Sequence, residues 1–182
     1  MKAAFILLFV ACGFASAAEH RSWAVKIGRP GLGNFHRVTA NLYRGAQPTA
    51  EGLRAAEKMG VKTVIDLRVF HSDADEAAGT KLVLERISFK TWHLEDDDVV
   101  RFLKVVTARK NQPVFVHCQH GSDRTGTMIA IYRIAIQGWS KREAIDEMTK
   151  GGFGFHPMWK NLVTYIEKAD VAALKRRAGV SG

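Results

Sequence analysis

The sequence predicts an α/β fold in which a central, mostly parallel sheet is flanked by helices. Two apolar segments rich in β-branched residues, 61–68 and 114–117, are typical of buried strands in a parallel sheet. Helical patterns over 50–59 and 124–137 alternate with these strands along the chain. Because parallel neighbours need crossover connections, this alternation favours a sheet with helices packed on its faces.

Local signals place the remaining elements. Thr49 is suited to cap the helix over 50–59, and Gly60 ends it. Residues 19–40 contain several glycines and a proline, so we expect an extended lead-in there. The other predicted elements are strands over 41–44 and within 81–94, a short helix over 73–79, helices over 99–106 and 141–150, and a final helix from 157 to about 177.

The length and composition predict one globular domain. The chain has 182 residues, of which 47% are hydrophobic and 25% are charged. Its net charge of +9 comes from basic residues spread along the sequence. No basic stripe is interleaved with aromatic residues, so general solvation with mild steering of anionic substrates is favoured over nucleic-acid binding.

The first 17 residues have the pattern of a secretory signal peptide. Lys2 is followed by the apolar run 3–11, and small residues at 15–17 predict cleavage after Ala17 or Ala18. We therefore expect an exported protein, periplasmic or secreted, whose domain spans 18–182. A weak lipobox-like match ending at Cys12 is the less favoured alternative, in which a lipid anchors the chain. No other segment has the length and hydropathy of a membrane span.

Removal of residues 1–17 leaves a single cysteine, Cys118, and a net charge of +8, because only Lys2 among the charged residues is lost. An exported chain with one cysteine forms no internal disulfide. Cys118 is therefore either an inert buried thiol or a reactive one. Its surroundings in the sequence favour the reactive alternative.

Cys118 opens a segment that is suited to bind a phosphate. It follows the strand 114–117, and Arg124 lies six residues later at the start of a helix. The backbone N–H groups of such a loop form an anion nest, and the helix N-terminus adds positive potential. The guanidinium of Arg124 can bind two phosphate oxygens at once. The same positive surroundings favour the thiolate form of Cys118, which is the nucleophilic form.

The motif His117-Cys118-x5-Arg124-Thr125-Gly126 resembles the phosphate loop of cysteine-dependent tyrosine and dual-specificity phosphatases. The segments 41–48 and 152–157 are similar to those of small bacterial dual-specificity-like phosphatases. The resemblance covers most of the chain after about residue 35, and it implies the fold of that family. It also implies hydrolysis of phosphomonoesters through a phosphocysteine, without a metal ion or cofactor.

The resemblance assigns roles within the loop. Cys118 is the expected nucleophile, and Arg124 is expected to hold the equatorial phosphate oxygens. Thr125 is expected to hydrogen-bond the sulfur of Cys118, and His117 to orient the loop. The expected phosphate-binding residues are Gln119, His120, Gly121, Ser122, Asp123, Arg124 and Thr125.

The proton donor to the leaving group is expected on a loop ahead of the helix over 99–106. An acidic run occupies that place, and Asp96 is our first choice within it, followed by Asp97. Asp98 is well explained by helix capping, although each of these acids stays a candidate for the proton donor. Asp123 is a competing donor, as in myotubularin-like lipid phosphatases. A structural role is favoured for it, namely hydrogen bonds to loop amides or a pair with a basic residue.

The substrate class and the type of function have alternatives. The loop carries no lysine between Cys118 and Arg124, which favours phosphotyrosine or simple phosphomonoesters over polyphosphorylated inositols. His120 can gain charge at low pH, so an inositol phosphatase stays open as an alternative. A sulfurtransferase and a non-catalytic phosphate-binding module are the alternatives of other classes. Neither a nucleic-acid partner nor a particular oligomeric state is indicated.

Overall fold

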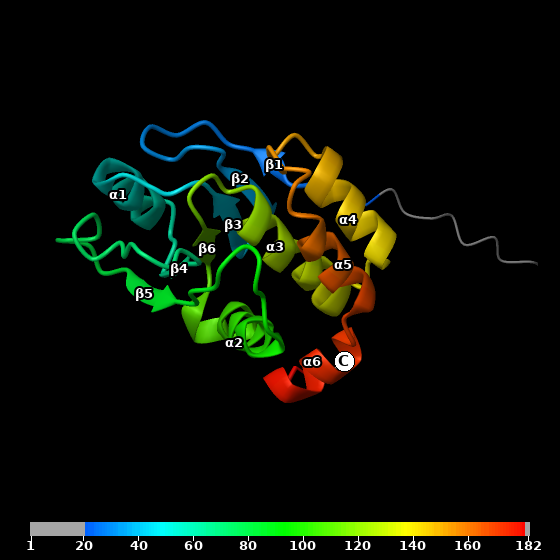
Figure 1. The fold of residues 1–182 in the computed structure, drawn as a ribbon. Helices are drawn as coiled ribbons and strands as arrows, with labels where there is room; N and C mark the ends of the chain where they lie inside the picture. The colour runs from blue at the N-terminus through cyan, green and yellow to red at the C-terminus, as the bar shows by residue number, and fades with distance from the viewer. Residues whose placement is uncertain (1–20, 181–182) are drawn as a thin grey trace, which may run out of the picture.

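The computed structural model describes residues 21–180, and its centre is a six-stranded sheet in the order β1-β2-β3-β6-β4-β5 (Figure 1). The pairs β3–β6, β6–β4 and β4–β5 are parallel, whereas β1–β2 and β2–β3 are antiparallel. This arrangement confirms the predicted mostly parallel sheet. The strands are β1 (Val25–Lys26), β2 (His36–Thr39), β3 (Leu42–Gly45), β4 (Thr63–Asp66), β5 (Val83–Arg86) and β6 (Val114–His117).

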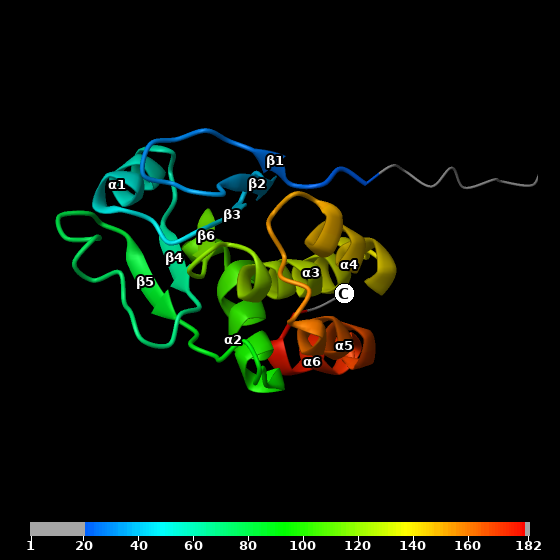
Figure 2. The same ribbon diagram turned by 45° about the horizontal axis from the view of Figure 1, so that its top comes forward.

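Helices cover both faces of the sheet, and each face has its own apolar core (Figure 2). On β6, Phe115 packs toward α1, while Val114 and Val116 pack toward the other helices, as the alternation of side chains along a strand requires. The helices are α1 (Ala50–Lys58), α2 (Asp96–Thr107), α3 (Asp123–Gln137), α4 (Lys141–Lys150), α5 (Lys160–Lys168) and α6 (Val171–Ala178), with a 3-10 turn over Arg109–Asn111.

Three predicted elements differ from the structure. The lead-in contains β1 and β2, which extend the sheet by antiparallel pairing. The final helix is two helices, because the side chain of Asp170 caps a new helix by accepting from the N–H of Ala173 at 2.9 Å. Residues 73–79 form turns instead of a helix. The caps at Thr49 and Ser140 are confirmed.

The carboxyl ends of β3, β4 and β6 meet at one edge of the sheet, where ligand sites of α/β folds open. At this edge β6 passes through the loop 118–122 into α3. Among residues 21–180, no helix combines the length and apolar character needed to cross a membrane. The predicted signal peptide and Cys12 lie outside the described residues.

Candidate active site

The loop between β6 and α3, residues 118–122, turns its carbonyl oxygens away from its own centre. Within residues 21–180, none of the backbone N–H groups of 119–122 donates a hydrogen bond. Inward N–H groups without a protein acceptor are what an anion nest requires. The carbonyl oxygens accept from outside the loop: that of Gln119 from the N–H of Gln47 (3.2 Å), that of His120 from the amide of Asn34 (2.9 Å) and that of Gly121 from the guanidinium of Arg44 (2.7 Å).

Gly121 lets the loop lie directly on the end of β3. Its φ of +72° is in the left-handed region, which favours glycine. A Cβ atom at this position would lie 2.4 Å from the carbonyl carbon of Gly45. Any other residue at 121 would therefore push the loop off the sheet, so the sequence and the shape of the loop are linked here.

Cys118 and Arg124 lie at the two ends of this loop. Cys118 is the residue that follows β6, and only 2% of its surface is exposed. Arg124 lies in the first turn of α3, and its Nη1 donates to the carbonyl oxygen of Leu67, just beyond β4, at 3.2 Å. Arg124 and Gln119 line an open pocket of about 220 Å³, so the loop forms one wall of a cavity.

The predicted hydrogen bond between Thr125 and the sulfur of Cys118 is not present. The hydroxyl of Thr125 is fully buried and has no hydrogen-bond partner among the described residues. Buried hydroxyl groups are normally satisfied. The hydroxyl is therefore free to bond a group that binds within the loop, and its phosphate-binding role stays a prediction.

A buried network of charges supports the strand ends beneath the pocket. The guanidinium of Arg68 donates to Asp66 at 2.9 Å and to Asp73 at 2.6 Å. Asp73 also bonds Nε2 of His117 at 2.7 Å, while Nδ1 of that ring lies 3.2 Å from the carbonyl oxygen of Cys118. His117 is thereby held in place next to Cys118, in agreement with an orienting role.

These groups also include the one set of possible metal ligands found within residues 21–180, namely Asp66, Asp73 and His117. Arg68 already bonds both oxygens of Asp66 and one oxygen of Asp73, and His117 bonds the other. The position of a cation is thus taken by a guanidinium. The cluster is better described as a buried ion-pair network than as a metal site.

This network makes stability depend on pH. Burial acts to raise the pKa of Asp73, but the hydrogen bond from His117 and the charge of Arg68 outweigh it and hold the pKa below its usual range. An acid with a lowered pKa stabilises the fold above its unfolded pKa of about 4, and the contribution is lost as the pH falls through the folded pKa.

We expect Asp73→Asn to lower the free energy of unfolding at pH 7 by about 3 kcal/mol, because it removes one of the two buried carboxylates that pair with Arg68 and the carboxylate that bonds His117. Urea denaturation of both proteins between pH 7 and pH 3 measures this difference. It should begin to shrink below about pH 4, where the carboxylate of the unfolded chain gains a proton, and shrink further as the pH falls through the lower pKa of the folded state. Exposed Asp75→Asn is the matched control. A difference that is equal at pH 7 and pH 3 would contradict this account.

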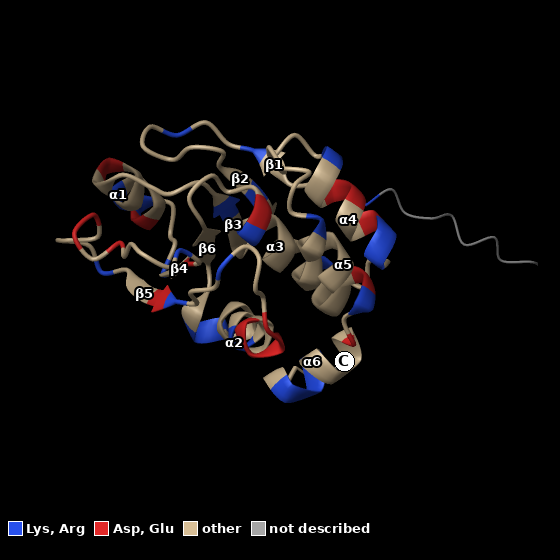
Figure 3. Ribbon diagram, in the orientation of Figure 1, with Lys and Arg blue, Asp and Glu red and all other residues tan. Residues whose placement is uncertain are grey.

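The structure does not bring Asp96 to the loop. Asp96 is the first residue of α2, and its carboxylate accepts from the hydroxyl of Tyr165 at 2.7 Å and lies 3.6 Å from Arg177. It lines a different pocket, formed mainly by α5. Asp97 pairs with Arg177, so the acidic start of α2 faces the basic end of α6 (Figure 3). Asp98 completes a capping box with Glu95, as helix capping predicted.

Asp123 has the structural role that the sequence favoured. Its carboxylate is buried and accepts from the backbone N–H of His156 at 2.8 Å, and it also bonds Nδ1 of that ring at 2.8 Å. The pair connects the start of α3 to the segment between α4 and α5. The carboxylate of Asp123 therefore holds the end of the loop against the segment that contains His156. The predicted binding of phosphate by the backbone N–H of Asp123 stays a prediction.

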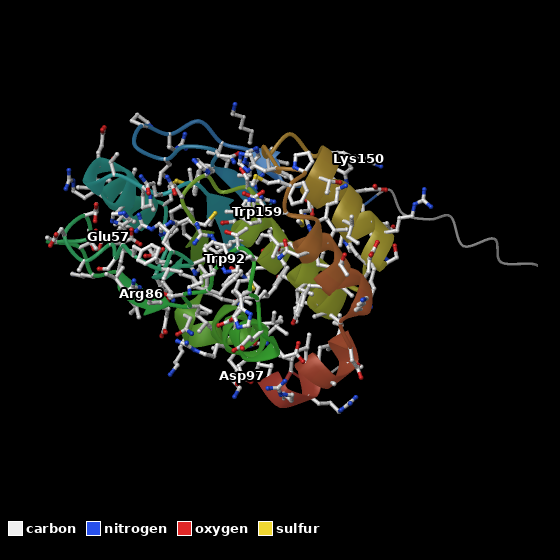
Figure 4. The ribbon with its side chains drawn as sticks, in the orientation of Figure 1. Glu57, Arg86, Trp92, Asp97, Lys150 and Trp159 are labelled. Carbon is white, nitrogen blue, oxygen red and sulfur yellow. The ribbon has the colours of Figure 1, made fainter. Side chains whose placement is uncertain are left out.

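The outer rim of the pocket was not predicted from the sequence. Phe70 and Trp92 line it and are 85% and 63% exposed, and Lys90 lies beside them. Trp92 stacks on Trp159 with ring centroids 6.4 Å apart (Figure 4). Phe70 follows the carboxyl end of β4, and Lys90 and Trp92 follow that of β5. The rule that ligand sites of α/β folds open at the carboxyl ends of the strands is the signal that could have identified them.

A family described as DSP-PTPase phosphatase fused to NAD+ kinase matches residues 34–163, which include the whole loop from Cys118 to Arg124. The chain belongs to the dual-specificity-like tyrosine phosphatase family. Within this family it is 34% identical over 163 residues to the dual specificity protein phosphatase TpbA of Pseudomonas aeruginosa strain UCBPP-PA14, covering 88% of this chain and 72% of the relative. It is 26% identical over 151 residues to the inositol diphosphatase DSP3 of Arabidopsis thaliana, covering 79% and 73%.

Solved structures agree with this membership. The crystal structure of a cysteine-to-serine variant of P. aeruginosa TpbA in complex with pTyr superposes with a TM-score of 0.78 at 29% identity. The match covers 90% of this chain and 99% of that one. The predicted phosphatase fold is thus confirmed, and the chain is a phosphatase of the tyrosine and dual-specificity type.

Proposed function

We propose that this phosphatase hydrolyses phosphotyrosine and related aryl phosphomonoesters through a phosphocysteine intermediate. The observation that carries the proposal is the loop in which the carbonyl oxygens of Gln119, His120 and Gly121 accept hydrogen bonds from outside, with Cys118 at its start and Arg124 at its end. Such a loop binds a dianion and a thiolate by the same N–H groups and the same guanidinium.

The chemistry proceeds in two displacements at phosphorus. The Cys118 sulfur attacks in line, the P–O bond to the leaving group breaks, and a proton passes to the departing oxygen. Arg124 and the loop N–H groups stabilise the three equatorial oxygens in the transition state. Water then attacks phosphorus, the P–S bond breaks, and inorganic phosphate and the thiolate are released.

The rim favours an aromatic leaving group. Phe70 and Trp92 offer exposed rings at the mouth of the pocket, and aromatic pairs contribute beyond their buried area. The relative TpbA has been seen with pTyr bound, which supports the same class here. Lys90 is the observation that favours the second candidate, an inositol phosphatase, because it adds a cation to the rim that the loop itself lacks.

The experiment is a panel of steady-state measurements with a phosphotyrosyl peptide, a phosphoseryl peptide and an inositol pyrophosphate. We expect the highest kcat/KM for the phosphotyrosyl peptide, by about tenfold or more, because only this substrate places a ring between Phe70 and Trp92. A larger kcat/KM for the inositol pyrophosphate would replace the first candidate with the second. Thiosulfate-dependent cyanide conversion without phosphatase turnover would indicate a sulfurtransferase.

We retain Asp96 as the proposed proton donor, on the sequence argument alone. The same panel is measured with Asp96→Asn and Asp123→Asn, with the neighbouring Asp97→Asn as control. Loss of the donor should lower kcat for phosphotyrosine about 100-fold and change little for an aryl phosphate with a more acidic leaving group. A loss confined to Asp123→Asn would move the role to that residue.

We also propose export, with cleavage after Ala17 or Ala18, from the pattern of residues 1–17. N-terminal sequencing of the protein recovered from the cell envelope or medium tests it. A chain that still begins at Met1, or one that begins at a lipidated Cys12, would contradict it.

A further inference from the structure

The least exposed charged residue beneath the loop is Arg44 on β3, which the chemistry above does not use. It is 0% exposed and pairs in register with Val116 of β6, two residues before the nucleophile. Its Nη2 donates to the carbonyl oxygen of Gly121 at 2.7 Å, and its guanidinium carbon lies 3.8 Å from the ring centre of Phe153. Burial lowers the pKa of Arg44 to about 10, so it is still a cation at neutral pH.

This cation has no carboxylate partner among the described residues. Its Nε and Nη1 atoms are buried without a hydrogen bond. The carboxylate of Glu147 lies in the same region, but it is bound by Arg133 at 2.6 and 2.7 Å and by the N–H of Ala24 at 2.7 Å. A buried charge without compensation is destabilising by several kcal/mol, so its retention calls for a function.

The geometry of the peptide group indicates that function. The carbonyl of Gly121 and the N–H of Ser122 belong to one planar trans peptide and point in opposite directions. When Arg44 holds the carbonyl outward, it therefore turns the N–H of Ser122 into the loop. Phe153 supports the arrangement from the far side, because its carbonyl oxygen accepts from the hydroxyl of Ser122 at 2.7 Å and its ring lies against Arg44.

The structure assigns to Arg44 the role of a positioning residue that sets the anion nest and supplies a buried positive charge to the thiolate and the phosphate. This inference deepens the proposed function and rests on it. The other ionisable groups around Arg44 do not supply this charge. Arg133 and Glu147 neutralise each other, and burial together with Arg44 lowers the pKa of His36 on β2. His117 is bound by Asp73, and Arg124 acts from the pocket side.

The test compares two variants. Arg44→Met removes both the positive charge and the planar guanidinium group, whereas Arg44→Lys keeps the positive charge and removes only the planar group. The pH dependence of iodoacetamide alkylation at Cys118 is followed by peptide mass spectrometry in the full chain. Affinity for inorganic phosphate is measured by calorimetry, and kcat/KM is measured with a phosphotyrosyl peptide. The double variant Arg133→Met/Glu147→Gln is the matched control, because it also removes a buried guanidinium, together with the carboxylate that pairs with it, and leaves no unpaired carboxylate beside Arg44.

For Arg44→Met we expect the alkylation curve to move about one unit to higher pH and phosphate affinity to fall about tenfold. For Arg44→Lys we expect the alkylation curve to stay within about half a unit while kcat/KM falls about tenfold, because the fork that orients Gly121 is lost. The double variant Arg133→Met/Glu147→Gln should lower stability and leave the alkylation curve unchanged.

A folded Arg44→Met with the alkylation curve and phosphate affinity of the wild type would overturn the inference. If Arg44→Met does not fold, Arg44→Lys decides, and wild-type kcat/KM in that variant overturns it. Alkylation and phosphate binding do not depend on turnover. Shifts in both with no turnover of any phosphate ester would therefore refute the proposed function and leave the role of Arg44 standing.

Discussion

Cys118→Ser is expected to abolish turnover of every phosphate ester while phosphate binding is retained. Serine is nearly isosteric with cysteine, but its hydroxyl is not ionised at neutral pH, and among the described residues no base bonds the side chain at position 118, since His117 contacts only the backbone carbonyl of that residue. The inward N–H groups of residues 119–122 do not depend on the sulfur. We therefore expect kcat to fall by a factor on the order of 10⁴ or more, as removal of an enzyme nucleophile generally gives.

The measurement pairs single-turnover kinetics with calorimetric binding of inorganic phosphate. A radiolabelled phosphate ester quenched in acid should leave label on the wild-type chain and none on Cys118→Ser. The neighbouring Ser122→Ala is a useful control, because it changes a hydroxyl that bonds Phe153 and not the nucleophile. Turnover by Cys118→Ser within tenfold of the wild type would rule out covalent catalysis at this residue.

The strands and the loop could be predicted from the sequence because their signals are local. The apolar run 114–117 can only be a buried strand, and a cysteine, an arginine and a glycine at fixed spacing after it specify a loop and a helix start. The caps at Thr49 and Ser140 were found for the same reason, since a cap is formed by residues three apart in the chain.

Contacts between distant segments could not be predicted in this way. Asp96 was chosen because the family resemblance places the proton donor ahead of this helix, yet its carboxylate bonds Tyr165 and lies near Arg177, about 70 and 80 residues later. Arg44 lies at the end of the predicted strand 41–44, and no local pattern marks it as buried. Its burial under Gly121 depends on the parallel pairing of β3 with β6, which no local pattern contains.

Arg124→Lys is expected to have the second largest effect on activity. The planar fork of arginine binds two phosphate oxygens in fixed geometry, and lysine offers a single point charge on a flexible stem. Nη1 of Arg124 donates to the carbonyl oxygen of Leu67, so the fork is oriented before a substrate binds. Because the equatorial oxygens carry the charge of the transition state, we expect kcat to fall about 10³-fold, with a smaller change in phosphate affinity.

Steady-state kinetics on a phosphotyrosyl peptide separate these effects, since loss of transition-state binding lowers kcat more than it raises KM. Arg101→Lys is the matched control, because Arg101 also donates to a backbone carbonyl, that of Arg86 at 2.8 Å, but it does not line the pocket. Phosphate affinity lost in step with kcat/KM, with kcat unchanged, would mean that Arg124 binds ground state and transition state equally. Turnover by Arg124→Lys within tenfold of the wild type would contradict this prediction. The N–H groups of the loop and Arg44 would then be the main source of transition-state stabilisation, and the guanidinium of Arg124 would serve only to hold the end of β4 against α3.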